Sequence, residues 1–289
     1  MPNPHARALA RSASPSVGLL IHEVSNPFFS EIASGVLAAA ERHDRMVMIC
    51  NTRRDPEQEL RYVSEMKALR LHAILVAGSE FVDEEVKGRL DAELESYRRA
   101  GGRVVLMRPH PTGTVIIPDS RRGSRLVADH FLNLGHRRIA VIAGPSQLAS
   151  IKERMTAFVD HLASRGISPV AVVEEDFSRD GGQRAAVDIL SRHSDCTALF
   201  AVNDLMALGA VRAARHMGLV VPDQVSIAGF NDLPSAVDAY PPLTTVRLPL
   251  REMGERALEL VLGDEPAERP PLVLDVELII RGSTGSAPG

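Results

Sequence analysis

Short apolar runs that alternate with longer segments of helical period are the feature that most constrains how this chain folds. The run at 17–22 is followed by a segment from 27 to 42 in which Ile32, Val36 and Ala40 recur at a spacing of four. Apolar residues at that spacing predict a helix with one buried face. A strand followed by such a helix, repeated along the chain, predicts parallel sheets covered by helices and so the α/β class.

The repeat is interrupted once and then begins again. Four strands are predicted up to residue 107, and the proline-rich passage 108–120 separates them from a helix at about 123–134 and a strand at 138–144. Two such series predict two doubly wound parallel-sheet lobes. A late amphipathic helix within 241–262 has no complete sheet of its own, and we expect it to cross back to the first lobe. A single final strand is expected after it, at 272–280.

The bulk properties of the chain exclude several classes of function. A net charge of −4 and a pI near 6.2 give no basic field, so strong binding to DNA or RNA by this chain alone is not expected. No segment approaches the ~20 apolar residues of a membrane span and no apolar signal segment precedes the first strand, so we expect a cytoplasmic protein without a membrane contact. Cys50 and Cys196 have no metal-like spacing, and the common nucleophile, phosphate-binding and metal motifs are absent. The sequence therefore predicts no enzyme, no cofactor and no metal site.

Polar and aromatic side chains follow several of the predicted strands. In open parallel sheets, ligands bind beyond the carboxyl ends of the strands, where helix N-termini present free N–H groups. The residues that we expect to converge on one cleft are Asn26, Phe28, Phe29, Ser150, Arg154, Phe177, Asn203, Asn231 and Asp232.

The first of these segments combines a helix start with two aromatic residues. Asn26 and Pro27 are a suitable N-cap and first helical residue. Phe28 and Phe29 would then lie in the first turn, where a ring can stack on the C–H face of a sugar or on a heterocycle. The alternative is that one or both rings pack in the core.

The polar residues of the second lobe have alternative interpretations too. The guanidinium of Arg154 could give two parallel hydrogen bonds to vicinal hydroxyls or to a carboxylate. It could instead form a surface ion pair with Glu153 or Asp119. Asn203 offers both donors and an acceptor to a ligand, but it also stands where an N-cap is expected, and Asp204 is equally open to a turn or a ligand role.

Five segments in order along the chain carry a more specific signal. They are SNPFFSEI at 25–32, LGHRRIAVIAGP at 134–145, AVNDLMALGA at 201–210, VPDQVSIAGFND at 221–232 and PPLTTVRLPLREMG at 241–254. Together they resemble the regulators of the lactose-repressor/galactose-repressor (LacI/GalR) family. The resemblance spans nearly the whole chain.

The resemblance implies a fold like that of periplasmic sugar-binding proteins, with an effector between two lobes that three crossovers join. The crossovers are expected near 118–120, 248–250 and 276–278. The implied domains are a residual hinge segment at 1–14, an N-terminal lobe at 15–118 plus 249–276, a C-terminal lobe at 119–248 plus 277–283, and a disordered tail at 284–289. The resemblance also implies a homodimer, for which the helix at 56–70 and the strand ending at Gly78 are candidate contact surfaces.

The residues at the matching positions bear on the identity of the effector. Phe28, Phe29, Ser150, Arg154, Phe177 and Asn203 match positions that line the effector pocket in the family. Asn231 stands where many relatives have an aspartate, so the pocket lacks that charge unless Asp232 or Asp119 supplies it. Leu148 takes a place that is basic in the purine-responsive branch. A neutral sugar or polyol is therefore the preferred effector.

The first residues resemble the hinge helix that follows the DNA-reading head in this family. Arg7 and Leu9 would be its DNA-contacting residues, with Leu9 wedged into the minor groove; the alternative is a frayed tail. No recognition helix precedes this segment, so binding to operator DNA is expected only in a full-length protein with a helix-turn-helix head. A solute-binding protein for sugar uptake and a headless effector binder are the alternatives to a regulator core.

Overall fold

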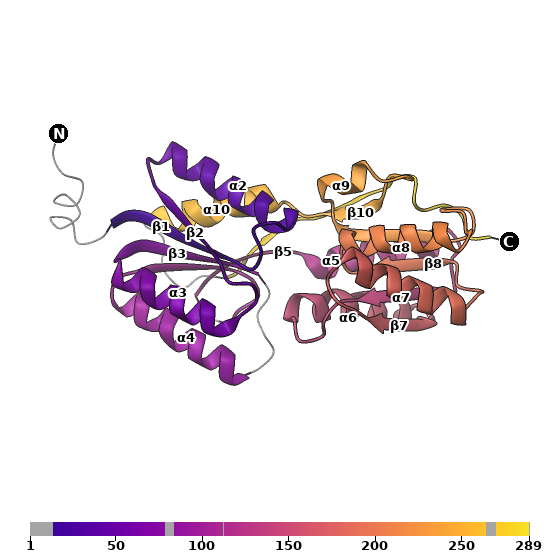
Figure 1. The fold of residues 1–289 in the computed structure, drawn as a ribbon, viewed down its shortest axis with the longest axis horizontal. Coiled ribbons are helices and arrows are strands. Elements are labelled where there is room, and N and C mark those ends of the chain that lie inside the picture. Colours follow the sequence, from indigo (N-terminus) through magenta and orange to yellow (C-terminus); the bar gives the residue numbers. More distant parts are fainter. Residues whose placement is uncertain (1–13, 79–83, 112, 264–269, 289) are drawn as a thin grey trace. The chain divides into compact units, whose positions relative to one another are not determined.

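A computed structural model, drawn in Figure 1, describes residues 14–78, 84–111, 113–263 and 270–288. Arg7 and Leu9, the predicted DNA-contacting residues, lie outside the described residues. The chain forms two units, each with its own sheet: unit 1 is Met1–Pro118 with Pro249–Leu274, and unit 2 is Asp119–Leu248 with Asp275–Gly289.

Unit 1 is built on a six-stranded sheet in the order β11-β5-β4-β3-β1-β2. Every described pairing in it is parallel. Its elements are β1 (Ser14–Ile21), α2 (Pro27–Arg42), β2 (Val47–Asn51), α3 (Pro56–Ala68), β3 (Leu71–Ala77), α4 (Glu84–Arg99), β4 (Arg103–Met107), β5 (Thr114–Pro118), α10 (Leu250–Leu262) and β11 (Leu272–Leu274).

Helices cover both faces of this sheet, as Figure 1 shows: α2 and α10 lie together on one face, and α3 and α4 lie on the other. Between α3, α4 and the sheet is a core in which Leu20, Val63, Met66, Ile74 and Leu106 are at most 1% exposed. The predicted late helix does return to the first sheet, as α10.

The contact between α2 and α10 is a close approach of two backbones. A Cβ added at Gly35 of α2 would lie 2.0 Å from the carbonyl oxygen of Arg251 in α10. A Cβ added at Gly254 of α10 would lie 2.1 Å from the carbonyl oxygen of Ile32 in α2. Because real Cβ atoms do not approach oxygen this closely, only glycine at these two positions permits the packing.

Unit 2 is built on a second six-stranded sheet in the order β12-β10-β9-β8-β6-β7. Its described pairings are parallel except that β12 runs antiparallel to β10. Its elements are α5 (Ser120–Asn133), β6 (Ile139–Ala143), α6 (Ala149–Ser164), β7 (Ala171–Glu174), α7 (Arg179–Arg192), β8 (Ala198–Ala201), α8 (Asp204–His216), β9 (Ser226–Asn231), α9 (Pro234–Val237), β10 (Thr244–Arg247) and β12 (Glu277–Ile279).

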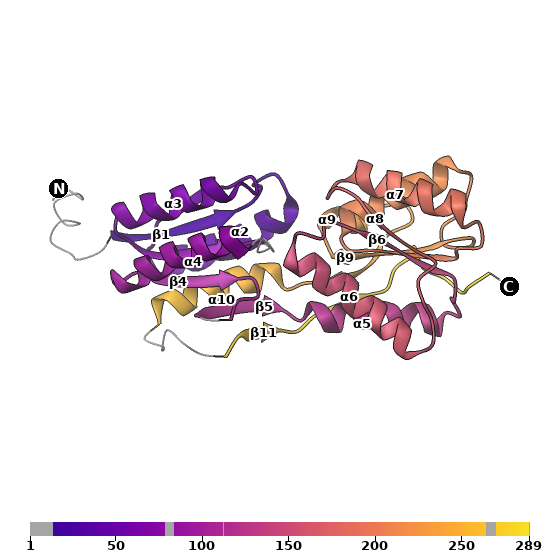
Figure 2. The same cartoon turned by 90° about the horizontal axis from the view of Figure 1, so that it is seen from below.

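Figure 2 shows α5 and α6 on one face of this second sheet and α7 and α8 on the other. Four fully buried phenylalanines run through the core. Phe131 meets Phe158 edge to face, Phe158 stacks on Phe200 with ring centroids 4.4 Å apart, and Phe200 meets Phe230 edge to face. Two mostly parallel sheets with alternating helices confirm the predicted α/β class and its doubly wound lobes.

Two predictions about strands were incomplete. The proline-rich passage at 108–120 contains a fifth strand, β5, because its Thr114–Pro118 segment pairs between β4 and β11. The single final strand predicted near 272–280 is two strands that belong to different sheets, β11 in unit 1 and β12 in unit 2. The change of unit therefore falls between Leu274 and Asp275, before the expected crossover at 276–278.

The segment at 284–287, part of the tail that we expected to be disordered, makes contacts within unit 2. Thr284 Oγ1 contacts His130 Nε2 at 2.9 Å, and the carbonyl of Gly285 lies 3.0 Å from Nε2 of the buried His136. The N–H of Ala287 donates to the carbonyl of Leu134 at 2.8 Å. The small residues of this segment therefore have hydrogen-bond partners that unit 2 supplies.

Candidate functional site

Arg154 is the centre of the candidate site in unit 2. It lies on α6, which follows β6, and only 5% of the residue is exposed. Its Nη1 donates to the carbonyl oxygen of Val202 and to Oδ1 of Asn231, both at 3.1 Å. Val202 follows β8 and Asn231 ends β9, so the guanidinium spans the carboxyl ends of two strands. The surface ion pair considered for Arg154 is not what the structure shows.

The surroundings of this guanidinium are largely apolar. Its Cζ lies 4.2 Å from the centroid of the Phe230 ring, a cation–π contact. Burial lowers the pKa of Arg154 to about 10, against the opposing influence of Asp204 and Glu153. The side chain therefore remains a cation at neutral pH, although it is shielded from water. Phe230, which the sequence analysis did not select, supports it from the last strand position before Asn231.

Asn203 has the N-cap role and also keeps an amide donor without a partner in the described residues. Its Oδ1 accepts from the N–H of Met206 at 2.8 Å and so caps α8. That bond identifies the oxygen, and the other amide atom, Nδ2, is a buried donor that has no partner in the described part of the chain. Asn203 is 1% exposed. The N-cap function leaves a donor for a second partner.

Asp204 supports the loop that carries the site. One carboxylate oxygen accepts from the N–H of Leu233 at 2.7 Å, and the other accepts from the hydroxyl of Thr245. Burial raises the pKa of Asp204 to about 6, and these hydrogen bonds act against that shift. Its oxygens hold the backbone after β9 in place.

Asn231 and Asp232 lie at the end of β9 and differ in what they contact. Both have positive φ, 122° and 57°, which short polar side chains tolerate better than bulky ones. Asn231 faces Arg154. The carboxylate of Asp232 accepts from Nε of Arg247 and from Nη2 of Arg281, both at 2.7 Å. Asp232 is thus engaged by two arginines.

Asp119 is also engaged within unit 2. Its carboxylate accepts from the N–H of Arg122 at 2.8 Å and caps α5. Glu153, beside Arg154 in the sequence, has a pKa raised by burial, and Arg121 and Arg154 partly oppose that rise. Asp119 adds to the rise through like charge. Carboxylates therefore lie in the neighbourhood of Arg154, but none forms an ion pair with it within 4.0 Å in the described residues.

Three further residues lie at the same edge of unit 2. Phe177 is half-buried, and its ring lies against Gly144, where an added Cβ would come within 2.4 Å of it. Ser150, in the first turn of α6, is half-buried. Leu148 is buried and precedes the helix without a side-chain cap. The ring of Phe177 and the first turn of α6 thus lie at the same edge of unit 2 as the guanidinium.

In unit 1, the predicted residues lie at the carboxyl end of β1. Oδ1 of Asn26 accepts from the N–H of Phe28 at 3.0 Å, which confirms the predicted cap with Pro27 at the first helical position. Phe29 is 4% exposed and meets the ring of His22 edge to face, so it packs in the core. Phe28 is half-buried and keeps part of its ring accessible.

The same edge of unit 1 carries a buried ion pair that the sequence analysis missed. Nη1 of Arg108, which follows β4, lies 3.3 Å from Oε1 of Glu59 in α3, and both side chains are 2% exposed. His22 Nδ1 contacts the hydroxyl of Thr52 at 3.0 Å. These residues are far apart in sequence, and no local pattern marks them as partners.

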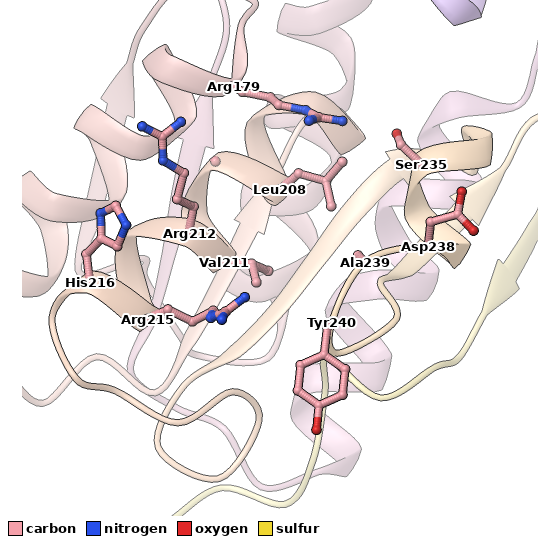
Figure 3. Close-up of a pocket in the computed structure, with 11 residues that line it drawn as sticks. Arg179, Leu208, Val211, Arg212, Arg215, His216, Ser235, Asp238, Ala239 and Tyr240 are labelled. Carbon is pink, nitrogen blue, oxygen red and sulfur yellow. The ribbon is translucent and has the colours of Figure 1, made fainter.

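A surface groove in unit 2 lies apart from these residues. Figure 3 shows arginines of α8 on one side of it and Asp238 and Tyr240 on the other. Its volume is about 790 Å³. It is lined by Arg179, Leu208, Gly209, Val211, Arg212, Arg215, His216, Ser235, Asp238, Ala239 and Tyr240. None of the predicted site residues lines it.

Within the described residues, no group of three or more histidine, cysteine, aspartate or glutamate side chains is placed to hold a metal ion. Among the helices in that same part of the chain, none has the length and hydrophobicity to cross a bilayer. Cys50 and Cys196 are free thiols, and burial raises the pKa of Cys196 to about 11. A thiol with so high a pKa is a poor nucleophile.

The two doubly wound units place the chain in the class of periplasmic binding protein-like folds. The family model described as a periplasmic binding protein-like domain matches residues 128–284. The chain is 33% identical over 289 residues to the HTH-type transcriptional regulator DegA of Bacillus subtilis (strain 168), covering 98% of this chain and 85% of that protein.

Solved structures give the same result. A lac repressor dimer bound to operator and the anti-inducer ONPF superposes with a TM-score of 0.88 at 25% identity, covering 99% of both chains. The complex of the transcriptional regulator CelR with cellobiose has a TM-score of 0.82 at 28% identity, covering 94% of this chain and 85% of that one. The chain belongs to the LacI/GalR family of transcriptional regulators. It is a regulator's effector-binding core and not an enzyme, as predicted.

Proposed function

We propose that this core binds a molecule of sugar or polyol size at the carboxyl edges of its sheets and couples that binding to operator DNA. The observation that carries the proposal is a pair of buried donors at the carboxyl edge of the second sheet. Nε of Arg154 and Nδ2 of Asn203 are buried and have no partner among the described residues. Leaving buried donors unsatisfied costs free energy, and a ligand rich in oxygen acceptors relieves that cost.

Other residues would complete the pocket. Phe28 in unit 1 and Phe177 in unit 2 are half-buried, and each could stack on the C–H face of a sugar ring. Asn26, Ser150 and Asn231 would add polar contacts. Phe29, Asp119 and Asp232 would act indirectly, since their side chains already pack or pair within their own units. The CelR–cellobiose complex, a relative at 28% identity, supports a sugar-like effector.

Coupling would arise from a shift between two lobe arrangements. An effector that binds the closed arrangement more tightly than the open one raises the population of the closed state. In a full-length regulator in the cytoplasm, that shift would reach a helix-turn-helix head through a hinge, where Arg7 and Leu9 would contact DNA. Whether the effector induces or represses depends on which arrangement favours the operator.

The test is a thermal-shift screen of the purified chain against sugars, polyols and nucleobases. A ligand at about 100 times its Kd adds roughly 2.7 kcal/mol of stability, which corresponds to a rise of about 5–10 °C in Tm. Arg154→Ala should abolish the rise. Arg212→Ala, which removes an exposed arginine of α8 in the same unit, should leave it intact. A rise that survives in Arg154→Ala would contradict the proposal.

A homodimer is the proposed assembly, and the lac repressor dimer among the similar structures supports it. Two of the exposed apolar residues in the described part of the chain mark candidate surfaces: Leu69 at the end of α3, near the contact predicted from the sequence, is 55% exposed, and Tyr240 beside the groove of Figure 3 is 82% exposed. Light scattering on Leu69→Arg and Tyr240→Arg would show which of the two surfaces forms the dimer contact. Only the variant on the true contact surface should become monomeric, and a monomeric parent chain would refute the dimer.

A further inference from the structure

Arg154 is a buried cation whose direct partners are all neutral. Its Nη1 has two acceptors at 3.1 Å, the carbonyl oxygen of Val202 and the amide oxygen of Asn231, and its face is covered by the Phe230 ring. Its Nε has no partner in the described part of the chain. Arg108, the comparably buried arginine of unit 1, is paired with the carboxylate of Glu59.

Two carboxylates attract Arg154 electrostatically, but neither forms an ion pair with it within 4.0 Å in the described residues. Asp204 attracts Arg154 electrostatically, but its two oxygens accept from Leu233 and Thr245. Glu153 shares its attraction between Arg154 and Arg121. A buried charge that lacks a contacting counter-charge is costly, and the cost falls when a ligand brings the missing charge.

The second free group is a donor as well. Oδ1 of Asn203 is occupied by the cap of α8, so only Nδ2 can meet a ligand. Asn203 directly follows Val202, whose carbonyl accepts from Arg154, so the two free donors come from adjoining parts of the site. Two N–H donors, one of them charged, suit the two oxygens of a carboxylate, which accepts and never donates.

We infer that the effector carries a carboxylate that Arg154 and Asn203 bind, as a sugar acid does, and that Asn231 determines this preference. The inference rests on the proposed function and narrows its effector class from any molecule of sugar size to a sugar acid. An aspartate in place of Asn231 would give Arg154 its own counter-charge and would repel a carboxylate. The amide of Asn231 keeps the oxygen that accepts from the guanidinium of Arg154. Because this amide is neutral, the positive charge of Arg154 remains available to the carboxylate of the ligand.

The experiment compares gluconate and galacturonate with glucose, galactose, sorbitol and glucose 6-phosphate by calorimetry. We expect one of the two acids to bind the parent chain, and its neutral counterpart to bind at least about 100-fold more weakly, since loss of a buried charge complement costs several kcal/mol. Asn231→Asp should weaken the binding of that acid by a similar factor. Asn133→Asp, the same change at an exposed residue of α5, should not.

A second readout needs no ligand. The unliganded Asn231→Asp protein should melt a few degrees above the parent chain, because the new carboxylate pairs with Arg154, whereas Asn133→Asp should not raise Tm. A Tm at or below that of the parent chain, or failure of the variant to fold, would overturn the inference.

The binding outcomes separate the two proposals. If a neutral sugar binds as tightly as its acid, or the phosphate binds more tightly than both acids, or neither acid binds, the carboxylate assignment is wrong. The proposed function survives those results if the ligand that does bind is lost in Arg154→Ala. It fails if no bound compound depends on Arg154.

Discussion

Replacing Glu59 with glutamine should strongly destabilise unit 1. The change keeps the size of the side chain but removes the negative charge that lies 3.3 Å from Nη1 of Arg108, where both side chains are 2% exposed. At an effective dielectric constant of about 20, the lost attraction is roughly 5 kcal/mol. The glutamine amide can return about 1 kcal/mol as a hydrogen bond. A net loss of about 4 kcal/mol agrees with the roughly 3–5 kcal/mol typical of a broken buried pair.

Urea unfolding followed by circular dichroism measures the loss, and hydrogen exchange of the amides in β3 and β4 assigns it to unit 1. Glu57→Gln is the matched control on the same helix, because Glu57 pairs with Arg89 at the exposed surface. That control should leave the urea midpoint unchanged within error, since exposed pairs contribute little. The double variant Glu59→Met with Arg108→Met should recover most of the stability, because it removes both charges.

Two results would refute this reasoning. A loss below about 1 kcal/mol in Glu59→Gln would mean that water reaches Arg108 and screens its charge. A double variant as unstable as the single one would mean that the two side chains stabilise unit 1 through packing and not through charge.

Three further predictions concern packing and pH. Gly35→Ala should lower the urea midpoint by separating α2 from α10, at a cost of about 1–3 kcal/mol or more, and an unchanged midpoint would contradict the close approach. Because burial raises the pKa of Asp204 to about 6, its contribution to stability is fully present below its unfolded value near 3.9 and is lost as the pH rises through 6. Asp204→Asn should flatten that part of the pH profile of unfolding free energy, and a profile parallel to that of the parent would argue against the shift. Burial lowers the pKa of His136, so its contribution is present above about 6.5 and is lost as the pH falls through the lowered value. The protection factor of the Gly285 amide, which corrects the exchange rate for the intrinsic slowing of exchange in acid, should therefore fall on acidification, and His136→Gln should remove the dependence; a protection factor that is flat with pH in the parent would contradict it.

Much of the fold follows from local patterns. The spacing of Ile32, Val36 and Ala40 predicted α2, and the Asn26–Pro27 pair predicted where it starts, because capping involves atoms only two or three residues apart. The strand β5, within the proline-rich passage, could not be predicted from a local pattern. A strand between two parallel neighbours is defined by partners distant in sequence, such as Leu272 beside Ile116.

The candidate site was predictable as a set of positions but not as a set of contacts. Strand ends located Arg154, Asn203 and Asn231, since a parallel sheet brings its carboxyl ends together. The sequence could not show that Phe230 lies under the guanidinium, or that Asp232 is held by two arginines. Those contacts depend on side-chain packing across the sheet, which has no period along the chain.

The return of α10 to unit 1 has a consequence for synthesis on the ribosome. The first part of unit 1 leaves the ribosome with the Gly35 face of α2 uncovered, and all of Asp119–Leu248 must follow before α10 arrives. At roughly 5–20 residues per second, that delay is on the order of ten seconds. Unit 2 can form its sheet, apart from β12, within that interval, so most of unit 2 can fold before unit 1 receives its last helix.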